Sequence, residues 1–265
     1  PDLLILDASS HLPATGRHAA REFAQGHVPG AHYLDLGSLK DATSPVPNAL
    51  PTGDQVAARL AELGYRPGQR IVIYDASDVK TSARAWFALR RAGIGPLALL
   101  DGGLGKWRAE GRELESGEAQ IDPGQPQHLG ASDSRVRNKA QMLSNISSGA
   151  EQVVDARDAE RFSAATADTG HNLPGGHIPG SRNLFFRDLY NGDGTFKDNE
   201  RLREAFASAG IDLDRPIVTT CGSGVTASVL LFALHRLGIE DAALYDGSWS
   251  EWGADPETPK ASGTS

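Results

Sequence analysis

Four short motifs occur twice along this 265-residue chain, in the same order, with each second copy 145 to 150 residues after the first. Self-similarity at a nearly constant offset is the signature of a duplicated structural unit. The two halves are therefore expected to fold into the same kind of domain. The paired segments are 3–8 with 151–156, 26–31 with 176–181, 71–75 with 217–221, and 100–103 with 245–248.

Each half alternates short apolar runs with longer amphipathic segments. Runs such as 71–74 and 217–220 have the length and composition of buried strands. Strands that alternate with helices predict a parallel sheet covered by helices on both faces. The fold class is therefore α/β, with two tandem domains, each a mostly parallel sheet flanked by helices. We expect helices at 55–63, 82–92, 200–208 and 225–237.

The boundary between the halves follows from composition. Segment 115–127 is rich in Gly, Pro and Gln and lacks periodicity, which is typical of a linker. The end of the chain is polar and contains proline, which predicts a frayed tail. We expect domains at 1–115 and 132–253, a linker at 116–131 and a tail at 254–265.

Charge and hydropathy exclude some partners. A formal net charge of −8 disfavours a surface for nucleic acid or anionic lipid. No apolar run in the sequence approaches the ~20 residues of a membrane span, and the start lacks the order of a signal peptide. One cysteine permits no internal disulfide, as in a reducing compartment. We therefore expect a cytoplasmic protein with neither nucleic acid nor membrane as partner.

That single cysteine, Cys221, lies between an expected strand at 216–220 and an expected helix from 225. Backbone N–H groups of the turn and of the helix start are expected to point at its sulfur, and they favour the nucleophilic thiolate. Neighbouring glycines open the backbone toward a ligand. We therefore predict that Cys221 is a catalytic nucleophile rather than a buried structural thiol. The anion-binding loop would comprise Gly222, Ser223, Gly224, Val225 and Thr226.

The first half differs at this loop. Asp75 occupies the position of Cys221 and is followed by Ala-Ser-Asp instead of Gly-Ser-Gly. A carboxylate there cannot act as a thiolate nucleophile, so we expect the first half to be catalytically inactive. Ligands of open α/β sheets bind beyond the carboxyl ends of the strands, where Cys221 is expected. The halves thus diverge where the chemistry is expected.

Other uses of such a loop fit less well. A cysteine phosphatase would carry an arginine six residues after the cysteine, and Ala227 stands there. The pattern G-x-G-x-x-A at 222–227 also occurs in dinucleotide-binding turns. Those turns belong to the first strand–helix unit of a domain, whereas this one lies late in its domain, which disfavours a dinucleotide site. The histidines lack metal-ligand spacing, and His27 and His177 are expected to hydrogen-bond their own turns. We expect no metal and no organic cofactor.

Three motifs are informative together. A Gly-His-Val/Ile-Pro-Gly segment occurs in each half, and the second half adds the loop at 221–226 and Asp-Gly-Ser-Trp at 246–249 with Trp252. With these motifs the whole chain resembles the tandem rhodanese-fold sulfurtransferases. The neutral loop is similar to that of the 3-mercaptopyruvate branch, whereas thiosulfate-using relatives usually carry basic side chains beside the cysteine. Segments 7–23 and 74–78 resemble the same branch.

The resemblance implies a reaction in two halves. 3-Mercaptopyruvate gives its sulfur to the Cys221 thiolate, which becomes a persulfide, and pyruvate leaves. A thiol acceptor such as thioredoxin or glutathione, or cyanide, then takes the sulfur. The hydroxyls of Ser223 and Thr226 would hydrogen-bond the bound sulfur; alternatively, Ser223 caps the helix and Thr226 fills its first turn.

The resemblance also implies residues that bind the donor. Arg161 aligns with a family arginine that holds the substrate carboxylate, whereas Arg157 is expected to be structural beside the Gly-His-Ile-Pro-Gly turn. A second substrate arginine of the family is missing, and His171 lies close to its place. Asn48 and Gly37 stand where the mercaptopyruvate branch often has a histidine and an acidic residue that act with a serine.

Two other functions stay open at this point. The donor would be thiosulfate if the chain followed the rhodanese branch. In a different class of function, Cys221 would carry sulfur or sense redox state without turnover of a small donor.

Overall fold

A computed structural model describes residues 2–130, 132 and 134–264. Residue 131 of the expected linker, residue 133 and residue 265 of the expected tail lie outside the described residues, as does residue 1. The chain divides into two compact units, each built from one half plus a short segment of the other. Unit 1 comprises Pro1–Ala42, Leu50–Ser132 and Gly192–Phe196; unit 2 comprises Thr43–Ala49, Asp133–Asn191 and Lys197–Ser265.

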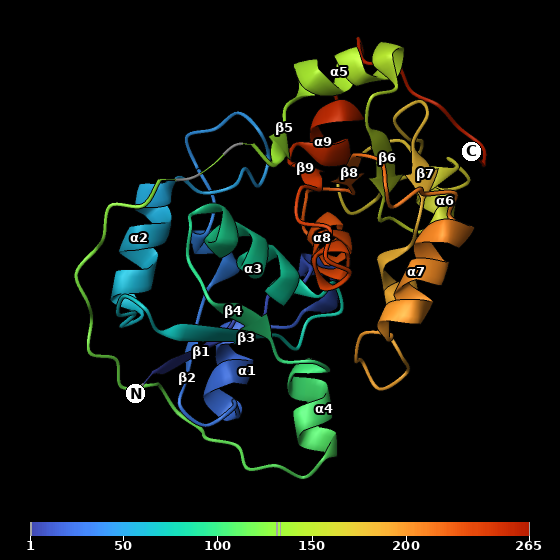
Figure 1. Cartoon of the computed structure of the whole chain (residues 1–265). Helices are drawn as coiled ribbons and strands as arrows, with labels where there is room; N and C mark the ends of the chain where they lie inside the picture. Colours follow the sequence, from blue (N-terminus) through green and yellow to red (C-terminus); the bar gives the residue numbers. More distant parts are fainter. Residues whose placement is uncertain (1, 131, 133, 265) are drawn as a thin grey trace. The chain divides into compact units, whose positions relative to one another are not determined.

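Unit 1 contains a parallel sheet (Figure 1). Its described residues form four strands in the order β2-β1-β3-β4. The strands are β1 (Leu3–Asp7), β2 (Ala31–Tyr33), β3 (Arg70–Tyr74) and β4 (Leu97–Leu99). The helices are α1 (Ala19–Gln25), α2 (Gly53–Glu62), α3 (Thr81–Arg91) and α4 (Gly103–Ala109), with 3-10 turns η1 (Pro13–Thr15) and η2 (Leu36–Ser38).

Unit 2 contains a second parallel sheet, whose described strands follow the order β5-β9-β8-β6-β7. The strands are β5 (Val136–Arg137), β6 (Gln152–Asp155), β7 (Arg182–Asn183), β8 (Ile217–Thr220) and β9 (Ala243–Tyr245). The helices are α5 (Lys139–Ser148), α6 (Ala159–Phe162), α7 (Asn199–Ser208), α8 (Ala227–Arg236) and α9 (Ser248–Trp252), with the 3-10 turn η3 (Phe186–Leu189).

The duplication seen in the sequence is a duplication of topology. The order β4-β3-β1-β2 in unit 1 equals β9-β8-β6-β7 in unit 2, and β5 adds an edge strand to the second sheet. The α/β fold class with two parallel, helix-flanked sheets is confirmed. The four expected helices are present as α2, α3, α7 and α8, with ends shifted by one or two residues.

The central strand of unit 2 explains why its sequence is a continuous apolar run. All four residues of β8 are buried, because the strands beside it and the helices around it leave no face to solvent. Helix α8, which follows, is buried along most of its length. No helix among the described residues is long and apolar enough to cross a membrane.

The histidine of each Gly-His-x-Pro-Gly segment has the same environment in both units. The rings of His27 and His177 stack on Phe23 and Phe162, with centroids 3.9 Å apart in each pair. Each Nδ1 also hydrogen-bonds the carbonyl oxygen of that phenylalanine, at 2.8 and 2.9 Å. The role is therefore local and structural, but the partner is the preceding helix and not the histidine's own turn.

The described residues of the tail, up to 264, are held by hydrogen bonds, so the prediction of a frayed tail is wrong for this part. Ala261 and His177 exchange two backbone hydrogen bonds of 2.9 Å. The indole Nε1 of Trp252 donates to the carbonyl of Pro259 at 2.8 Å. Polar composition suggested fraying, but pairing with a distant segment ties this backbone down.

The segment expected to be a linker lies along unit 1. Its described residues between 116 and 130 contain no helix or strand. Gly117 donates its N–H to the carbonyl of Ala24 at 2.8 Å, and Gly124 donates to Ala61 at 2.7 Å. This segment therefore has hydrogen-bonded anchors on α1 and α2.

Candidate active site

Cys221 directly follows β8, at the carboxyl end of the central strand of unit 2. The cysteine is 2% exposed. The start of α9 holds the backbone around it: Trp249 donates its N–H to the carbonyl of Cys221 at 2.9 Å, and Ser250 donates to Gly222 at 2.8 Å. The N–H of Cys221 in turn donates to the Ser248 hydroxyl at 3.2 Å. The Asp-Gly-Ser-Trp motif at 246–249 therefore fixes the position of the cysteine.

The sulfur accepts one backbone hydrogen bond from the residues described. The N–H of Gly224 donates to Sγ at 3.1 Å. Gly224 has φ +79°, a conformation that favours glycine. Several such donors were expected, but α8 begins at Ala227, two residues later than the sequence pattern predicts, so its first N–H groups come after the turn.

The two loop hydroxyls lie at the helix start without a protein partner. Thr226, and not Ser223, stands at the N-cap of α8, and its side chain makes no capping hydrogen bond. The interpretation of Ser223 as the cap is therefore wrong. Both residues are half-buried, and within the described part of the chain neither hydroxyl has a hydrogen-bond partner. Both side chains are available to a ligand.

Arg157 is buried beside this loop. Its Nη2 donates to Asp155 at 2.7 Å and to the carbonyl of Gly176 at 2.7 Å. The guanidinium carbon lies 4.6 Å from the centroid of the Trp249 ring, whose backbone holds Cys221. The expectation that Arg157 packs at the Gly-His-Ile-Pro-Gly turn is confirmed, since Gly176 opens that turn.

The charge of Arg157 also lies near the nucleophile. Burial lowers the pKa of the guanidinium, but the charges of Asp155, Asp168 and the Cys221 thiolate raise it, and the pKa lies above its ordinary value. The Cys221 sulfur is among the groups that act on the guanidinium, so a buried positive charge lies near the nucleophile. The sequence did not show this proximity.

Asp168 is a fully buried carboxylate that joins three cationic or titratable side chains. Its Oδ1 lies 2.9 Å from Nδ1 of His171 and 3.5 Å from Nη1 of Arg161, and its Oδ2 lies 3.5 Å from Nη1 of Arg157. Burial raises its pKa, but the hydrogen bond from His171 and the charges around it lower the pKa below the ordinary 3.8. The sequence analysis missed Asp168; its only signal is an acidic residue three positions before His171.

His171 lies directly against the residue that follows the nucleophile. A Cβ built on Gly222 would lie 2.9 Å from Nδ1 and 3.0 Å from Nε2 of the imidazole. The ring therefore fills the space that a side chain at position 222 would need. The His171 side chain remains 23% exposed. The structure thus brings His171 to the Cys221 loop.

Arg161, the other expected donor-binding residue, reaches the same group through Asp168. Its Nε donates to Asp158 at 2.7 Å, and Asp158 also caps α6 by accepting the N–H of Arg161 at 2.9 Å. The pKa of Asp158 is lowered: burial raises it, but the hydrogen bonds from Arg161 outweigh that effect. The guanidinium is 28% exposed, so it can still meet a ligand.

Gly37 and Asn48, which stand where the mercaptopyruvate branch often has an acidic residue and a histidine, fall in different units. Gly37 lies in η2 and donates its N–H to Asp35 at 2.9 Å. Asn48 has φ +55° and belongs to the segment grouped with unit 2.

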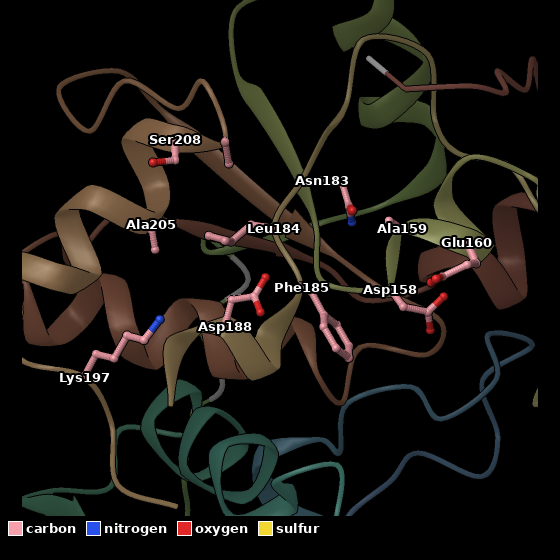
Figure 2. A pocket seen from close by; sticks show the side chains of 11 residues that line it. Asp158, Ala159, Glu160, Asn183, Leu184, Phe185, Asp188, Lys197, Ala205 and Ser208 are labelled. Atoms are coloured by element: carbon pink, nitrogen blue, oxygen red, sulfur yellow. The ribbon is translucent and has the colours of Figure 1, made fainter. Parts of the chain in front are cut away.

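A separate pocket of 590 Å³ lies in unit 2 (Figure 2). Asp158 and Glu160 line it near α6, and Asp188 and Lys197 line it near η3. Its lining does not include Cys221. Asp158 faces this pocket while its carboxylate holds Arg161. Among the described residues, no group of three or more His, Cys, Asp or Glu is arranged to hold a metal ion.

The arrangement around Cys221 suits attack on a small anionic substrate. The sulfur accepts the N–H of Gly224, and a buried guanidinium lies nearby. The His171 imidazole, hydrogen-bonded to Asp168, lies beside the next residue, and the partly exposed Arg161 reaches the same carboxylate.

Both halves of the chain match the rhodanese-like domain, at residues 3–110 and 138–255. The chain is 36% identical to the 3-mercaptopyruvate sulfurtransferase of Escherichia coli K12 over 260 residues, covering 98% of this chain and 92% of that protein. It is 37% identical to the human 3-mercaptopyruvate sulfurtransferase, covering 94% and 84% of the two chains. It is also 35% identical to the thiosulfate sulfurtransferase of Mus musculus, covering 100% and 90%.

The fold is similar to that of a solved relative. The crystal structure of SseA from Escherichia coli, described as a 3-mercaptopyruvate sulfotransferase of rhodanese fold, superposes with a TM-score of 0.84. The two chains are 34% identical, and the match covers 94% of this chain and 93% of the other.

Proposed function

The chain belongs to the rhodanese-like family and is a sulfurtransferase, and from this premise we propose that its sulfur donor is 3-mercaptopyruvate. In the proposed reaction Cys221 takes the sulfur as a persulfide and pyruvate is released. A thiol, such as thioredoxin or glutathione, or cyanide then accepts the sulfur.

The observation that carries this proposal is the absence of a side chain at position 222, next to the nucleophile. Gly222 follows Cys221, and the His171 ring occupies the place of a side chain there. Position 222 therefore presents no basic side chain next to the sulfur, whereas the resemblance implies that thiosulfate-using relatives usually carry basic side chains in this loop. A neutral loop fits a donor whose transferred sulfur is a thiol and whose negative charge, a carboxylate, lies several bonds away.

The first half-reaction is a nucleophilic displacement at sulfur. The Cys221 thiolate attacks the donor sulfur, the S–S bond forms, and the C–S bond of the donor breaks. The N–H of Gly224 holds the cysteine sulfur during attack. The hydroxyls of Ser223 and Thr226 supply hydrogen bonds to the transferred sulfur of the persulfide.

Arg161 anchors the donor carboxylate in this proposal. Its guanidinium is partly exposed, and Asp158 and Asp168 orient it from either side. A planar fork of N–H donors matches a carboxylate in two parallel hydrogen bonds.

Steady-state kinetics test the donor. Sulfur transfer to cyanide is measured with 3-mercaptopyruvate and with thiosulfate, and Cys221→Ala is the control. We expect kcat/KM to favour 3-mercaptopyruvate by about tenfold or more, which is ~1.4 kcal/mol of transition-state discrimination. A preference for thiosulfate would keep the family and the nucleophile but replace the donor, in line with the similarity to the mouse thiosulfate sulfurtransferase. No turnover with either donor would favour a sulfur carrier or redox sensor.

A second experiment tests Arg161. Arg161→Ala is expected to weaken donor binding by about 1.5–3 kcal/mol, the contribution of a charged hydrogen bond, and to raise KM accordingly. Arg201→Ala is a matched control, because Arg201 also pairs with the aspartate that caps its helix, at the start of α7. An unchanged KM in Arg161→Ala would contradict the anchoring role.

A further inference from the structure

We propose that His171 is the general acid of the donor half-reaction: it protonates the carbon that leaves when the C–S bond of 3-mercaptopyruvate breaks. Asp168 sets the tautomer of the imidazole for this role. The inference rests on the proposed function, because only a donor with a carbon leaving group needs such a proton.

The hydrogen bond to Asp168 decides which nitrogen faces the substrate. Nδ1 lies 2.9 Å from the Asp168 carboxylate, which is fully buried. Because an ionised carboxylate only accepts hydrogen bonds, Nδ1 carries a proton and Nε2 is left for the ligand. Among the described residues, none hydrogen-bonds Nε2. The partly exposed ring can therefore give and regain a proton at Nε2.

The charges around the pair keep Asp168 ionised. Arg157 and Arg161 each lie 3.5 Å from it, while His171 lies closest. The lowered pKa of Asp168 agrees with this geometry. An ionised Asp168 is placed to pair with the ring while the ring carries the proton that it donates.

The His171 ring also lies next to the loop that holds the nucleophile. It rests on the backbone of Gly222, whose preceding neighbour is the nucleophile. A donor whose sulfur meets Cys221 therefore has its carbon skeleton beside this loop. The other histidines of unit 2 do not share this position: His177 bonds Phe162, and His235 lies in the last turn of α8.

The step balances as follows. The thiolate electron pair of Cys221 forms the S–S bond, and the donor's thiol proton stays on the outer sulfur, giving Cys–S–SH. The electron pair of the breaking C–S bond moves onto the carbon skeleton as the enolate of pyruvate. The His171 imidazolium gives its Nε2 proton to the methylene carbon, which becomes the methyl group of pyruvate. Solvent restores the proton, so the sum is thiolate, donor and one proton giving persulfide and pyruvate.

Steady-state kinetics of pyruvate release and single-turnover discharge of the persulfide, both on the full chain, test the assignment. His171→Gln is the main variant. Glutamine can still donate a hydrogen bond to Asp168 but supplies no acid. We expect kcat for pyruvate release from 3-mercaptopyruvate to fall by about 10²-fold, the usual contribution of a general acid, with KM changed less than threefold or so. Discharge of the preformed persulfide to cyanide forms no enolate, so its rate is expected to stay at the wild-type value.

Two further variants separate acid catalysis from charge and from histidine removal as such. His171→Arg keeps a positive charge but is a poor proton donor, so it is expected to remain slow in pyruvate release. His235→Gln is the matched control, because His235 also pairs with a carboxylate, Glu240, at 2.8 Å. This control is expected to behave as the wild type.

The outcomes divide cleanly. A raised KM with unchanged kcat in His171→Gln, or recovery of kcat in His171→Arg, would make His171 a binding residue and overturn the inference. Slow persulfide discharge in His171→Gln would reduce its role to structure and also overturn it. A wild-type chain that turns over thiosulfate but releases no pyruvate from 3-mercaptopyruvate would instead contradict the proposed function.

Discussion

The loop after β3 in unit 1 and the loop after β8 in unit 2 have the same place in the same topology. They differ in how many backbone N–H groups hydrogen-bond the side chain that begins the loop. In unit 1, Asp75 fills its own loop: its two carboxylate oxygens accept the N–H groups of Ser77 and Ser82 at 2.8 and 2.9 Å. In unit 2, the Cys221 sulfur accepts one N–H, from Gly224. The carboxylate of Asp75 therefore accepts two N–H groups of its own loop, whereas the sulfur of Cys221 accepts one.

The second difference between the units lies just after the carboxyl ends of β1 and β6. Asp7 and Asp155 end β1 and β6, but Ser9 stands two residues after the first and Arg157 two residues after the second. Burial raises the pKa of Asp7, which hydrogen-bonds the N–H of Ser9. In unit 2 the guanidinium pairs with Asp155. The buried Asp155–Arg157 pair therefore lies in the half that has the thiol, whereas unit 1 has a serine at the position of the arginine.

Exchange of the two end-of-strand residues should have the largest effect. Cys221→Asp copies unit 1, and its carboxylate is expected to occupy the loop and abolish sulfur transfer to below about one per cent, as Cys221→Ala does. Asp75→Cys in the Cys221→Ala background is expected to stay inactive, because Ala-Ser-Asp and not Gly-Ser-Gly follows this position. Thiocyanate formation measures both, and activity in the second variant would show that the thiol alone is sufficient.

Arg157→Ser copies Ser9 and is expected to give the next largest effect. It leaves Asp155 and Asp168 buried without their guanidinium, at a cost of about 3–5 kcal/mol in the free energy of unfolding. Urea unfolding measures this loss. The double variant Arg157→Ser/Asp168→Asn removes one stranded charge and should recover part of it. Equal stability of the single and double variants would show that Asp168 is not paired with Arg157 in solution.

A single methyl group sharpens the comparison further. Ala76 in unit 1 aligns with Gly222 in unit 2, where a Cβ would meet the His171 ring. The φ of Gly222 lies outside the left-handed region, so the ring and not the backbone opposes Gly222→Ala. We expect this variant to lose about 1–3 kcal/mol of unfolding free energy, as in overpacked cores.

Removal of the ring provides the control. His171→Ala in the Gly222→Ala background should restore most of the lost stability in thermal unfolding, because the methyl group then has room. Ala76→Gly in unit 1 should change stability by less than about 1 kcal/mol. If Gly222→Ala costs the same with and without the ring, the contact with His171 is not its cause.

The pH dependence of two buried carboxylates should give the smallest effect, with opposite signs. The pKa of Asp168 lies below 3.8, so its contribution to stability is present at neutral pH and is lost as the pH falls through that lowered pKa. Burial holds the pKa of Asp7 above 3.8, so its contribution is present in acid and is lost as the pH rises through that raised pKa.

Asn substitutions measure each contribution as a difference from the wild type. The stability difference for Asp168→Asn should shrink between about pH 7 and pH 3, and that for Asp7→Asn should change the other way, each by on the order of 1 kcal/mol. Slopes of the same sign would contradict the assigned environments of the two carboxylates.

The sequence by itself determined the duplication, the α/β class and the position of the nucleophile. These follow from patterns read along the chain: motif repeats fix the unit, apolar runs between turns fix the strands, and a strand followed by Cys-Gly-Ser-Gly fixes the loop. Helix ends were predicted to within one or two residues, because capping and periodicity act over a single turn.

Tertiary structure alone decided the surroundings of the sulfur. Asp168 joins Arg157, Arg161 and His171 in three dimensions, and His171 contacts Gly222 fifty-one positions further along the chain. The anchored tail likewise depends on Ala261 pairing with His177. Composition and periodicity report only near neighbours, whereas a buried charge or a closed gap is set by which distant segments pack against it.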